Sequence, residues 1–255
     1  MRRLKITLAY DGTDYGGWQS QADGRTVQDE FEAALERVAG EFIRTVASGR
    51  TDAGVHAIGQ VLHFSTTSTL SAEIFQKALH AELPRDIVVL NSEDVPEDFH
   101  AIRSAQRKRY RYAIDDGVLP DVFARRYAWR VFPQLDEEVM RRAAAALIGT
   151  HDFVSFQTGG SERLTTVRTV FEINIQRGRA GEGRAGFSTA NLLHVEVEAD
   201  GFLYNMVRNI VGTLASVGRK KQPEHWPAEV LAAKDRRAAG PTAPPQGLCL
   251  LRVMY

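Results

Sequence analysis

The sequence predicts an α+β fold with a largely antiparallel sheet, because its strand patterns cluster and its helix patterns do not strictly alternate with them. A length of 255 residues allows one large domain or two smaller ones. With 44% hydrophobic and 25% charged residues, the composition is that of a globular protein rather than a disordered or fibrous one. No apolar stretch reaches the ~18 residues that a transmembrane helix needs, so we expect no membrane span.

Strand and helix patterns follow one another in the first hundred residues. Apolar residues alternate over 4–10, as in a half-buried strand. Thr26 then precedes an apolar stripe at helical spacing, with Asp29 in a capping-box-like position and Gly40 as the C-terminal stop. Further expected elements are strands over 42–47, 60–65 and 87–90, and a helix over 72–83 that ends before Pro84.

The later part of the chain shows the same mixture. Strands are expected over 110–114, 166–176, 192–199 and 248–255, and helices over 136–148 and 202–217. The Gly- and Arg-rich stretch 177–184 is typical of a long, mobile hairpin connection, and 237–247 is typical of a surface loop. Neither stretch is a clean domain linker.

Charge is distributed unevenly although the net charge is zero. Residues 101–130 hold 8 Lys and Arg against 3 Asp and Glu, and residues 200–255 hold 8 against 4. Within the first of these segments, cations interleave with aromatic residues over 103–112, a pattern that suits phosphates and exposed bases together. A solvated, charged strand face is the alternative.

Cysteine and histidine usage gives no sign of a disulfide or a metal site. The single cysteine, Cys249, has no partner for an internal disulfide, and the first residues lack an apolar export segment, so we expect a cytoplasmic protein. The seven histidines show no metal-ligand spacing. Phosphate-binding and dinucleotide-binding glycine motifs are also missing from the sequence. We therefore predict no metal and no cofactor.

The segment 49–56, Gly-Arg-Thr-Asp-Ala-Gly-Val-His, lies between two predicted strands and is too polar for a core. Gly49 and Gly54 permit tight turns from which Asp52 projects, and Arg50 is near enough to pair with a carboxylate or reach a phosphate or a base. Asp52 is thus a candidate acid, base or nucleophile. The alternative is an aspartate that caps a turn beside a surface arginine.

Four motifs, in this order, resemble those of the TruA-type tRNA pseudouridine synthases. They are 10–21 (Tyr-Asp-Gly-Thr-Asp-Tyr-Gly-Gly-Trp-Gln-Ser-Gln), 49–56, 108–112 (Lys-Arg-Tyr-Arg-Tyr) and 202–210 (Phe-Leu-Tyr-Asn-Met-Val-Arg-Asn-Ile). The resemblance spans nearly the whole chain, and four ordered motifs are more specific than any one. It implies the pseudouridine synthase fold, an antiparallel sheet with helices packed on one side, in two similar halves flanking a central cleft.

The resemblance implies an isomerase that converts uridine to pseudouridine at positions 38, 39 and 40 of the tRNA anticodon stem-loop, with Asp52 as the catalytic carboxylate. Such an enzyme breaks the N-glycosidic bond, rotates the uracil and joins its C5 to the ribose C1′, without redox chemistry or a hydrolytic water. The carboxylate acts as a nucleophile at C1′ or at C6, or as a base on a ribose proton. The sequence leaves these three routes open.

The resemblance also assigns residues around Asp52. Arg208 corresponds to the arginine that pairs with the carboxylate and favours its ionised form, and Tyr110 to the tyrosine that lies against the target uracil. Their alternatives are a surface or phosphate-binding arginine and a half-buried strand tyrosine. A stacked nucleotide must be extruded before reaction, and Arg50 is the candidate for filling the gap.

Basic residues are expected to form a cationic track for the tRNA backbone. They are Lys108, Arg109 and Arg111, joined by Lys220 and Lys221. On a strand, Arg109 and Arg111 share a face that points away from Tyr110, so phosphate contact and a structural role both remain open for them. Lys220 and Lys221 also suit a helix C-terminus, where the dipole favours cations.

We expect one continuous catalytic unit, in which residues 1–100 carry the catalytic loop and residues 101–255 carry the RNA-binding strand and the Arg208 helix. The resemblance further implies a homodimer that binds tRNA. A non-catalytic RNA-binding module is the main alternative, but an acidic Asp52 facing anionic RNA gives a mere binder no advantage. An RNA glycosidase is disfavoured because no second acid is identifiable as a partner.

Overall fold

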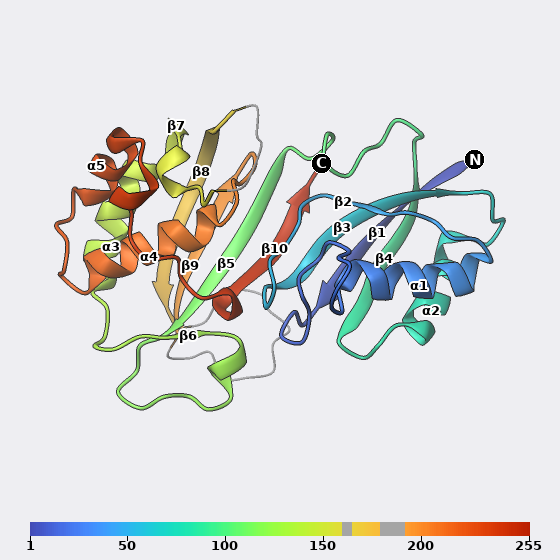
Figure 1. Cartoon of the computed structure of the whole chain (residues 1–255), viewed down its shortest axis with the longest axis horizontal. Helices are drawn as coiled ribbons and strands as arrows, with labels where there is room; N and C mark the ends of the chain where they lie inside the picture. Colours follow the sequence, from blue (N-terminus) through green and yellow to red (C-terminus); the bar gives the residue numbers. More distant parts are fainter. Residues whose placement is uncertain (160–164, 179–191) are drawn as a thin grey trace. The chain divides into compact units, whose positions relative to one another are not determined.

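The computed structural model describes residues 1–159, 165–178 and 192–255, which form two compact units (Figure 1). Unit 1 comprises Met1–Gln106 and Cys249–Tyr255, and unit 2 comprises Arg107–Leu248. Both units combine helices with a mostly antiparallel sheet, so the predicted α+β class is confirmed. The central cleft stays a prediction. Most of the connection expected over 177–184 lies outside the described residues.

The sheet of unit 1 has the strand order β4-β1-β3-β10, and β2 pairs with β3. Strands β1, β3 and β4 pair in antiparallel fashion, whereas β10 runs parallel to β3. The bounds are β1 (Arg2–Tyr10), β2 (Val46–Ala47), β3 (His56–Thr66), β4 (Ile87–Val95) and β10 (Leu248–Met254). The last strand of the chain therefore joins a sheet built from its first hundred residues.

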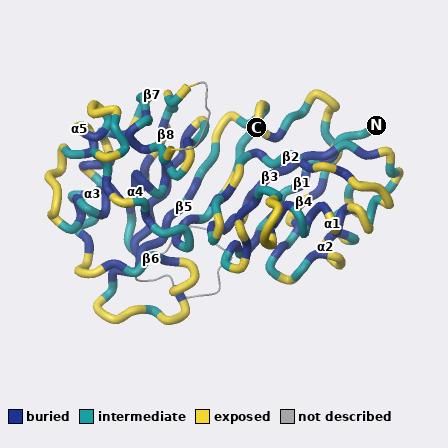
Figure 2. Tube along the Cα trace, viewed as in Figure 1, coloured by how far each residue is buried: buried dark blue, intermediate teal, exposed yellow. Residues whose placement is uncertain are grey.

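Helices α1 (Val27–Ala39) and α2 (Ala72–Glu82) complete unit 1. The side chain of Thr26 accepts a hydrogen bond from the Asp29 amide, and Gly40 ends α1 in the left-handed conformation, so both predicted caps are confirmed. The rings of Phe64 on β3 and Phe75 on α2 lie 5.7 Å apart, which joins sheet and helix in one core. Figure 2 shows buried residues along the strands of this unit.

The sheet of unit 2 has the order β5-β9-β8-β7, with antiparallel neighbours, and β6 pairs in parallel with β5. The strands are β5 (Arg107–Asp115), β6 (Trp129–Arg130), β7 (Gly149–Asp152), β8 (Val167–Arg177) and β9 (Leu193–Ala199). The helices are α3 (Glu137–Ala144), α4 (Met206–Gly218) and α5 (Trp226–Ala233). Helix α4 buries Ile210, Leu214 and Val217 completely, so it forms the centre of this core.

Three elements differ from expectation for local reasons. The strand expected over 42–47 is reduced to Val46–Ala47, because the buried carboxylate of Glu32 on α1 accepts from both the amide and the hydroxyl of Thr45. Helix α3 ends at Ala144 and continues as a 3₁₀ turn over Ala145–Leu147. Helix α4 begins only at Met206, because Asn205 has a φ of 61°.

Helix α5 was not predicted from the sequence. It is only eight residues long and begins Trp226-Pro227, and no apolar stripe at helical spacing marks it. None of the helices in the described part of the chain is long and apolar enough to cross a membrane.

Candidate active site

Asp52 lies in the loop between β2 and β3, and its neighbours are fixed by hydrogen bonds. The Trp18 amide donates to the Thr51 carbonyl at 2.9 Å, and the hydroxyls of Tyr10 and Thr51 are 2.8 Å apart. The Val55 amide donates to the Asp52 carbonyl at 3.1 Å. Asp52 itself is partly exposed. The backbone is thus held on both sides of a carboxylate that solvent can reach.

The motif 10–21 packs against this loop and supports it. Gly17 has a φ of +103°, and a Cβ atom there would lie 2.7 Å from the Thr51 carbonyl oxygen, so only glycine fits. Tyr15 and Trp18 are 4% and 2% exposed. These aromatics are therefore core residues rather than exposed base contacts. The two N-terminal motifs therefore form one rigid substructure.

The ends of the loop are anchored by two side chains, those of Gln60 and His56, of which sequence reasoning did not single out Gln60. Gln60 on β3 donates to the Gly49 carbonyl at 2.8 Å and accepts from the Ser48 hydroxyl at 3.0 Å. At the other end, the Gly12 amide donates to Nδ1 of His56 at 3.1 Å. His56 therefore has a structural hydrogen bond beside the loop. Arg50, at the start of the loop, is exposed.

Tyr110 lies on β5 of unit 2 and is 7% exposed. Its ring meets that of Phe202 edge-on, with centroids 5.1 Å apart. Phe202 belongs to the segment that precedes α4, so two of the four motifs, 108–112 and 202–210, are in direct contact within this unit.

Arg208 lies in the first turn of α4, and neutral acceptors hold its guanidinium group. Nε donates to the Ala243 carbonyl at 2.7 Å, and Nη1 donates to Oδ1 of Asn205 at 2.8 Å. Asp52 and Arg50 belong to unit 1, whereas Tyr110 and Arg208 belong to unit 2. The pairing of Asp52 with Arg208 stays a prediction.

Arg109 and Arg111 share one face of β5, as the strand alternation predicts. Their side chains bond to Glu196 on β9 at 2.7 Å and 2.6 Å. Burial of Glu196 raises its carboxyl pKa, but the hydrogen bonds and charges of Arg111 and Arg109 outweigh burial and hold the pKa below its usual value. These contacts favour the structural alternative for the two arginines. Lys108 on the same strand is partly exposed.

Lys220 and Lys221 follow the end of α4. The Lys220 amide donates to the Val217 carbonyl at 2.8 Å, and the Lys220 ammonium lies 3.4 Å from the Asp136 carboxylate. Both lysines are exposed. They occupy the helix C-terminus that the alternative interpretation predicts, and their contact with tRNA stays a prediction.

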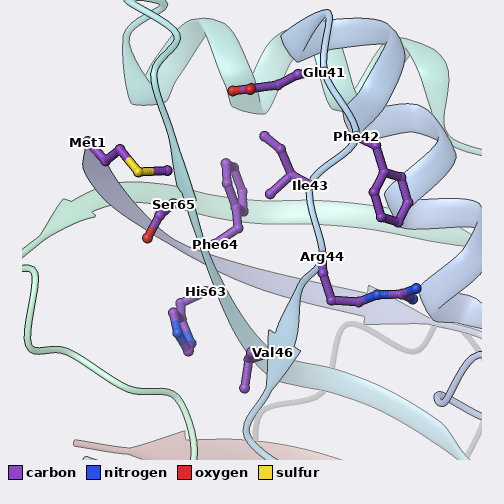
Figure 3. Close-up of a pocket in the computed structure, with 9 residues that line it drawn as sticks. All are labelled: Met1, Glu41, Phe42, Ile43, Arg44, Val46, His63, Phe64 and Ser65. Carbon is purple, nitrogen blue, oxygen red and sulfur yellow. The ribbon is translucent and has the colours of Figure 1, made fainter.

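A surface pocket of about 330 Å³ in unit 1 contains none of the predicted site residues (Figure 3). It lies between the segment before β2 and the strand β3. Arg44 at its rim lies over the Phe42 ring, 5.2 Å from the centroid, and bonds to Glu32 at 2.8 Å. In the described ranges no group of three or more His, Cys, Asp or Glu residues is arranged to hold a metal ion.

Comparison with known proteins identifies the family. The family profile described as tRNA pseudouridine synthase matches residues 6–102 and 143–255. The chain belongs to the tRNA pseudouridine synthase family. Among curated relatives, tRNA pseudouridine synthase A of Moorella thermoacetica is 51% identical over 255 residues, with 99% of each chain covered. Those of Brevibacillus brevis and Thermoanaerobacter sp. (strain X514) are 46% and 44% identical, with 100% of each chain covered.

Membership of the tRNA pseudouridine synthase family confirms the family resemblance predicted from the sequence. Asp52 and Arg208 lie within the two stretches that match the family profile, whereas Tyr110 lies between them. The catalytic roles of all three residues stay predictions.

Proposed function

We propose that this chain isomerises uridine to pseudouridine at positions 38, 39 and 40 of the tRNA anticodon stem-loop, with Asp52 as the catalytic carboxylate. Family membership supports the isomerase class and tRNA as the substrate. The observation that carries the site is the loop 49–56, where a hydrogen bond to the Thr51 carbonyl and another from the Val55 amide fix the backbone around a partly exposed Asp52.

The reaction needs a carboxylate held still rather than a cofactor. The bond from N1 to C1′ breaks, the bond from C5 to C1′ forms, C5 loses a proton and N1 gains one. Asp52 as a nucleophile at C1′ or C6, or as a base on a ribose proton, must be ionised in each case. Arg208 is proposed to pair with it, because an adjacent cation favours the ionised form.

Tyr110 is proposed to lie against the target uracil. Its edge-on contact with Phe202 restricts the rotation of the ring, so an extruded base would meet a fixed aromatic surface. The phenolic group of Tyr110 is then a candidate acid/base group in the removal of the C5 proton.

The proposed contacts with the tRNA are Arg50, Lys108, Arg109 and Arg111. Arg50 is exposed at the rim of the Asp52 loop, which suits a side chain that fills the gap left by an extruded nucleotide. Because Arg109 and Arg111 already bond to Glu196, we expect their phosphate contacts to contribute little to tRNA affinity.

The protein is also proposed to act as a homodimer in the cytoplasm. Light scattering coupled to size-exclusion chromatography tests the dimer. A mass of 28.3 kDa, that of one chain, at assay concentrations would contradict it.

The decisive experiment measures tritium released from an anticodon stem-loop transcript labelled at uridine C5. We expect the parent protein to release tritium into water and Asp52→Asn to release none, while its tRNA affinity is unchanged or raised, because a negative charge is lost from a polyanion site. Asp23→Asn removes the same charge from an exposed loop of unit 1 and serves as the control.

Two outcomes contradict the proposal. Turnover of Asp52→Asn within about tenfold of the parent would show that Asp52 is not the catalytic carboxylate. Tight tRNA binding by the parent without any tritium release would favour the non-catalytic RNA-binding module.

A further inference from the structure

The segment 235–244 is fastened to the N-terminal half of α4, around Arg208. A Cβ atom at Gly212 would lie 1.7 Å from the Pro241 carbonyl oxygen, so the segment crosses the helix at backbone contact distance. The Gly240 amide donates to the Thr213 hydroxyl at 3.0 Å. The Ala243 amide donates to the Arg208 carbonyl at 3.1 Å. A segment that its composition predicts to be a surface loop is therefore part of the Arg208 site.

Asn209, next to Arg208 in α4, is the centre of this attachment and is 0% exposed. Its Oδ1 accepts from Nη2 of Arg236 at 2.9 Å and from the Thr242 hydroxyl at 2.7 Å. Its Nδ2 donates to the Phe156 carbonyl at 2.7 Å. A buried amide with both ends bonded fixes the distance between helix and segment, because any displacement would break hydrogen bonds away from water.

Arg236 supplies the other half of the attachment. Nη1 donates to the Gly240 carbonyl at 3.0 Å, and Nη2 also donates to the Thr242 hydroxyl at 2.9 Å. These acceptors and Asn209 Oδ1 are all neutral, and burial lowers the pKa of Arg236. The next residue, Arg237, instead pairs with Asp235 and has a side chain that is 91% exposed. Burying part of a charged arginine among neutral acceptors costs solvation energy. In return, the planar guanidinium group holds several acceptors in fixed directions.

We infer that Arg236 is a positioning residue for Arg208. Arg236 and Thr242 hold the segment 240–243 against Asn209, and the Ala243 carbonyl at its end accepts the hydrogen bond from Arg208 Nε. Without Arg236 this acceptor shifts, and the guanidinium group of Arg208 loses its fixed direction. The inference rests on the proposed function, in which Arg208 acts on Asp52.

The first test compares Arg236→Met, Arg236→Lys and the control Arg237→Met, by single-turnover rate at saturating tRNA and by KM. We expect Arg236→Met to lower the saturated rate about tenfold or more, since small misplacements of catalytic groups have large effects, with KM changed less than about threefold. Arg236→Lys should recover little, because an ammonium cannot reproduce the fork. Arg237→Met should match the parent.

A double-mutant cycle distinguishes positioning from general structural support. In an Arg208→Ala background, Arg236→Met should cause less than about a twofold further loss of rate, because the group that it positions is gone. An equal loss in both backgrounds, or no loss from Arg236→Met alone, would overturn the inference. If Arg236→Met fails to fold, Thr242→Val, which removes one hydroxyl, replaces it in the double-mutant cycle. The same outcomes then support or overturn the inference.

The cycle also separates this inference from the proposed function. If Arg208→Ala leaves the saturated rate unchanged, the proposed role of Arg208 fails, and the positioning role fails with it. If Arg208→Ala lowers the rate and Arg236→Met does not, only the inference fails.

Discussion

His194 on β9 carries two buried ring nitrogens, neither of which has a hydrogen-bond partner in the described part of the chain. The residue is 2% exposed. Burial, together with the nearby charge of Arg111, lowers its pKa to about 4, although Glu196 opposes the shift. Between pH 6.5 and about 4, His194 is therefore neutral in the folded protein, whereas the same side chain is protonated in the unfolded chain.

This depressed pKa predicts a loss of stability in acid. Between pH 6.5 and about 4, His194 is protonated in the unfolded state but neutral in the folded state. The free energy of unfolding therefore decreases as the pH falls. For one proton the decrease is at most about 1.4 kcal/mol per pH unit. Urea unfolding across this range measures the slope. We expect His194→Gln to reduce the slope by the contribution of one proton and His80→Gln, at an exposed position on α2, to leave it unchanged. An unchanged slope in His194→Gln would contradict this assignment.

The two faces of β5 make different kinds of contact. Tyr110 packs against Phe202, whereas Arg107, Arg109 and Arg111 bond to carboxylates on β8 and β9. Glu196 and Glu198 have side chains that are 9% and 8% exposed. Burial makes these carboxylates dependent on the arginines, because an unpaired charge is costly away from water. The basic run 107–112 therefore contributes to the fold of the sheet as well as to the basic charge of its surface.

The double variant Arg109→Ala and Arg111→Ala tests this element. We expect a loss of about 3 kcal/mol or more in the free energy of unfolding, because Glu196 is left buried without its partners, and part of this loss should return when Glu196→Gln is added. Binding to tRNA is measured at a temperature where the variant is folded. There, the slope of the logarithm of the tRNA binding constant against the logarithm of salt concentration should change by less than the loss of one phosphate contact would produce. A slope shallower by about 0.9 per arginine would instead show that both are phosphate contacts.

At the scale of the whole molecule, the chain returns to its first unit at its C-terminus. Strand β10 pairs with β3, and the Tyr255 ring contacts the Phe99 ring in a tilted arrangement, with centroids 4.9 Å apart. The ammonium of Lys5 lies 5.2 Å from the Tyr255 ring centroid, and the Tyr255 hydroxyl donates to the Ala101 carbonyl at 2.9 Å. The last residue is thus joined to the first strand and to the segment before β5.

We expect Tyr255→Ala to destabilise unit 1 by about 2 kcal/mol, from the loss of ring packing and the cation–π contact, and Tyr255→Phe by about 1 kcal/mol, from the hydrogen bond alone. Hydrogen exchange at the amides of β1 and β3 reports on unit 1 directly. Equal protection in Tyr255→Ala and the parent would show that the C-terminal residue adds nothing to this unit.

The sequence by itself determined the α+β class, the Thr26-capped helix α1 and the family, because caps, alternation and ordered motifs depend on residues close together in the chain. It also placed Asp52 in a loop between strands. The support of that loop by Gly17 and Gln60 was not predictable, since neither residue carries a local signal for its contact, which for Gln60 is with Gly49 and for Gly17 is with Thr51.

Only the tertiary structure decided what the basic and loop segments contact. Arg109 meets Glu196, 87 residues later, and the supposed surface loop 237–247 begins beside the hydrogen bonds of Arg236 to Asn209. Composition identifies such segments as polar, but their partners are chosen by strand register and by close backbone approach, as at Gly212. The contacts of the segment 235–244 fix Arg208. No periodicity within the chain encodes such long-range contacts.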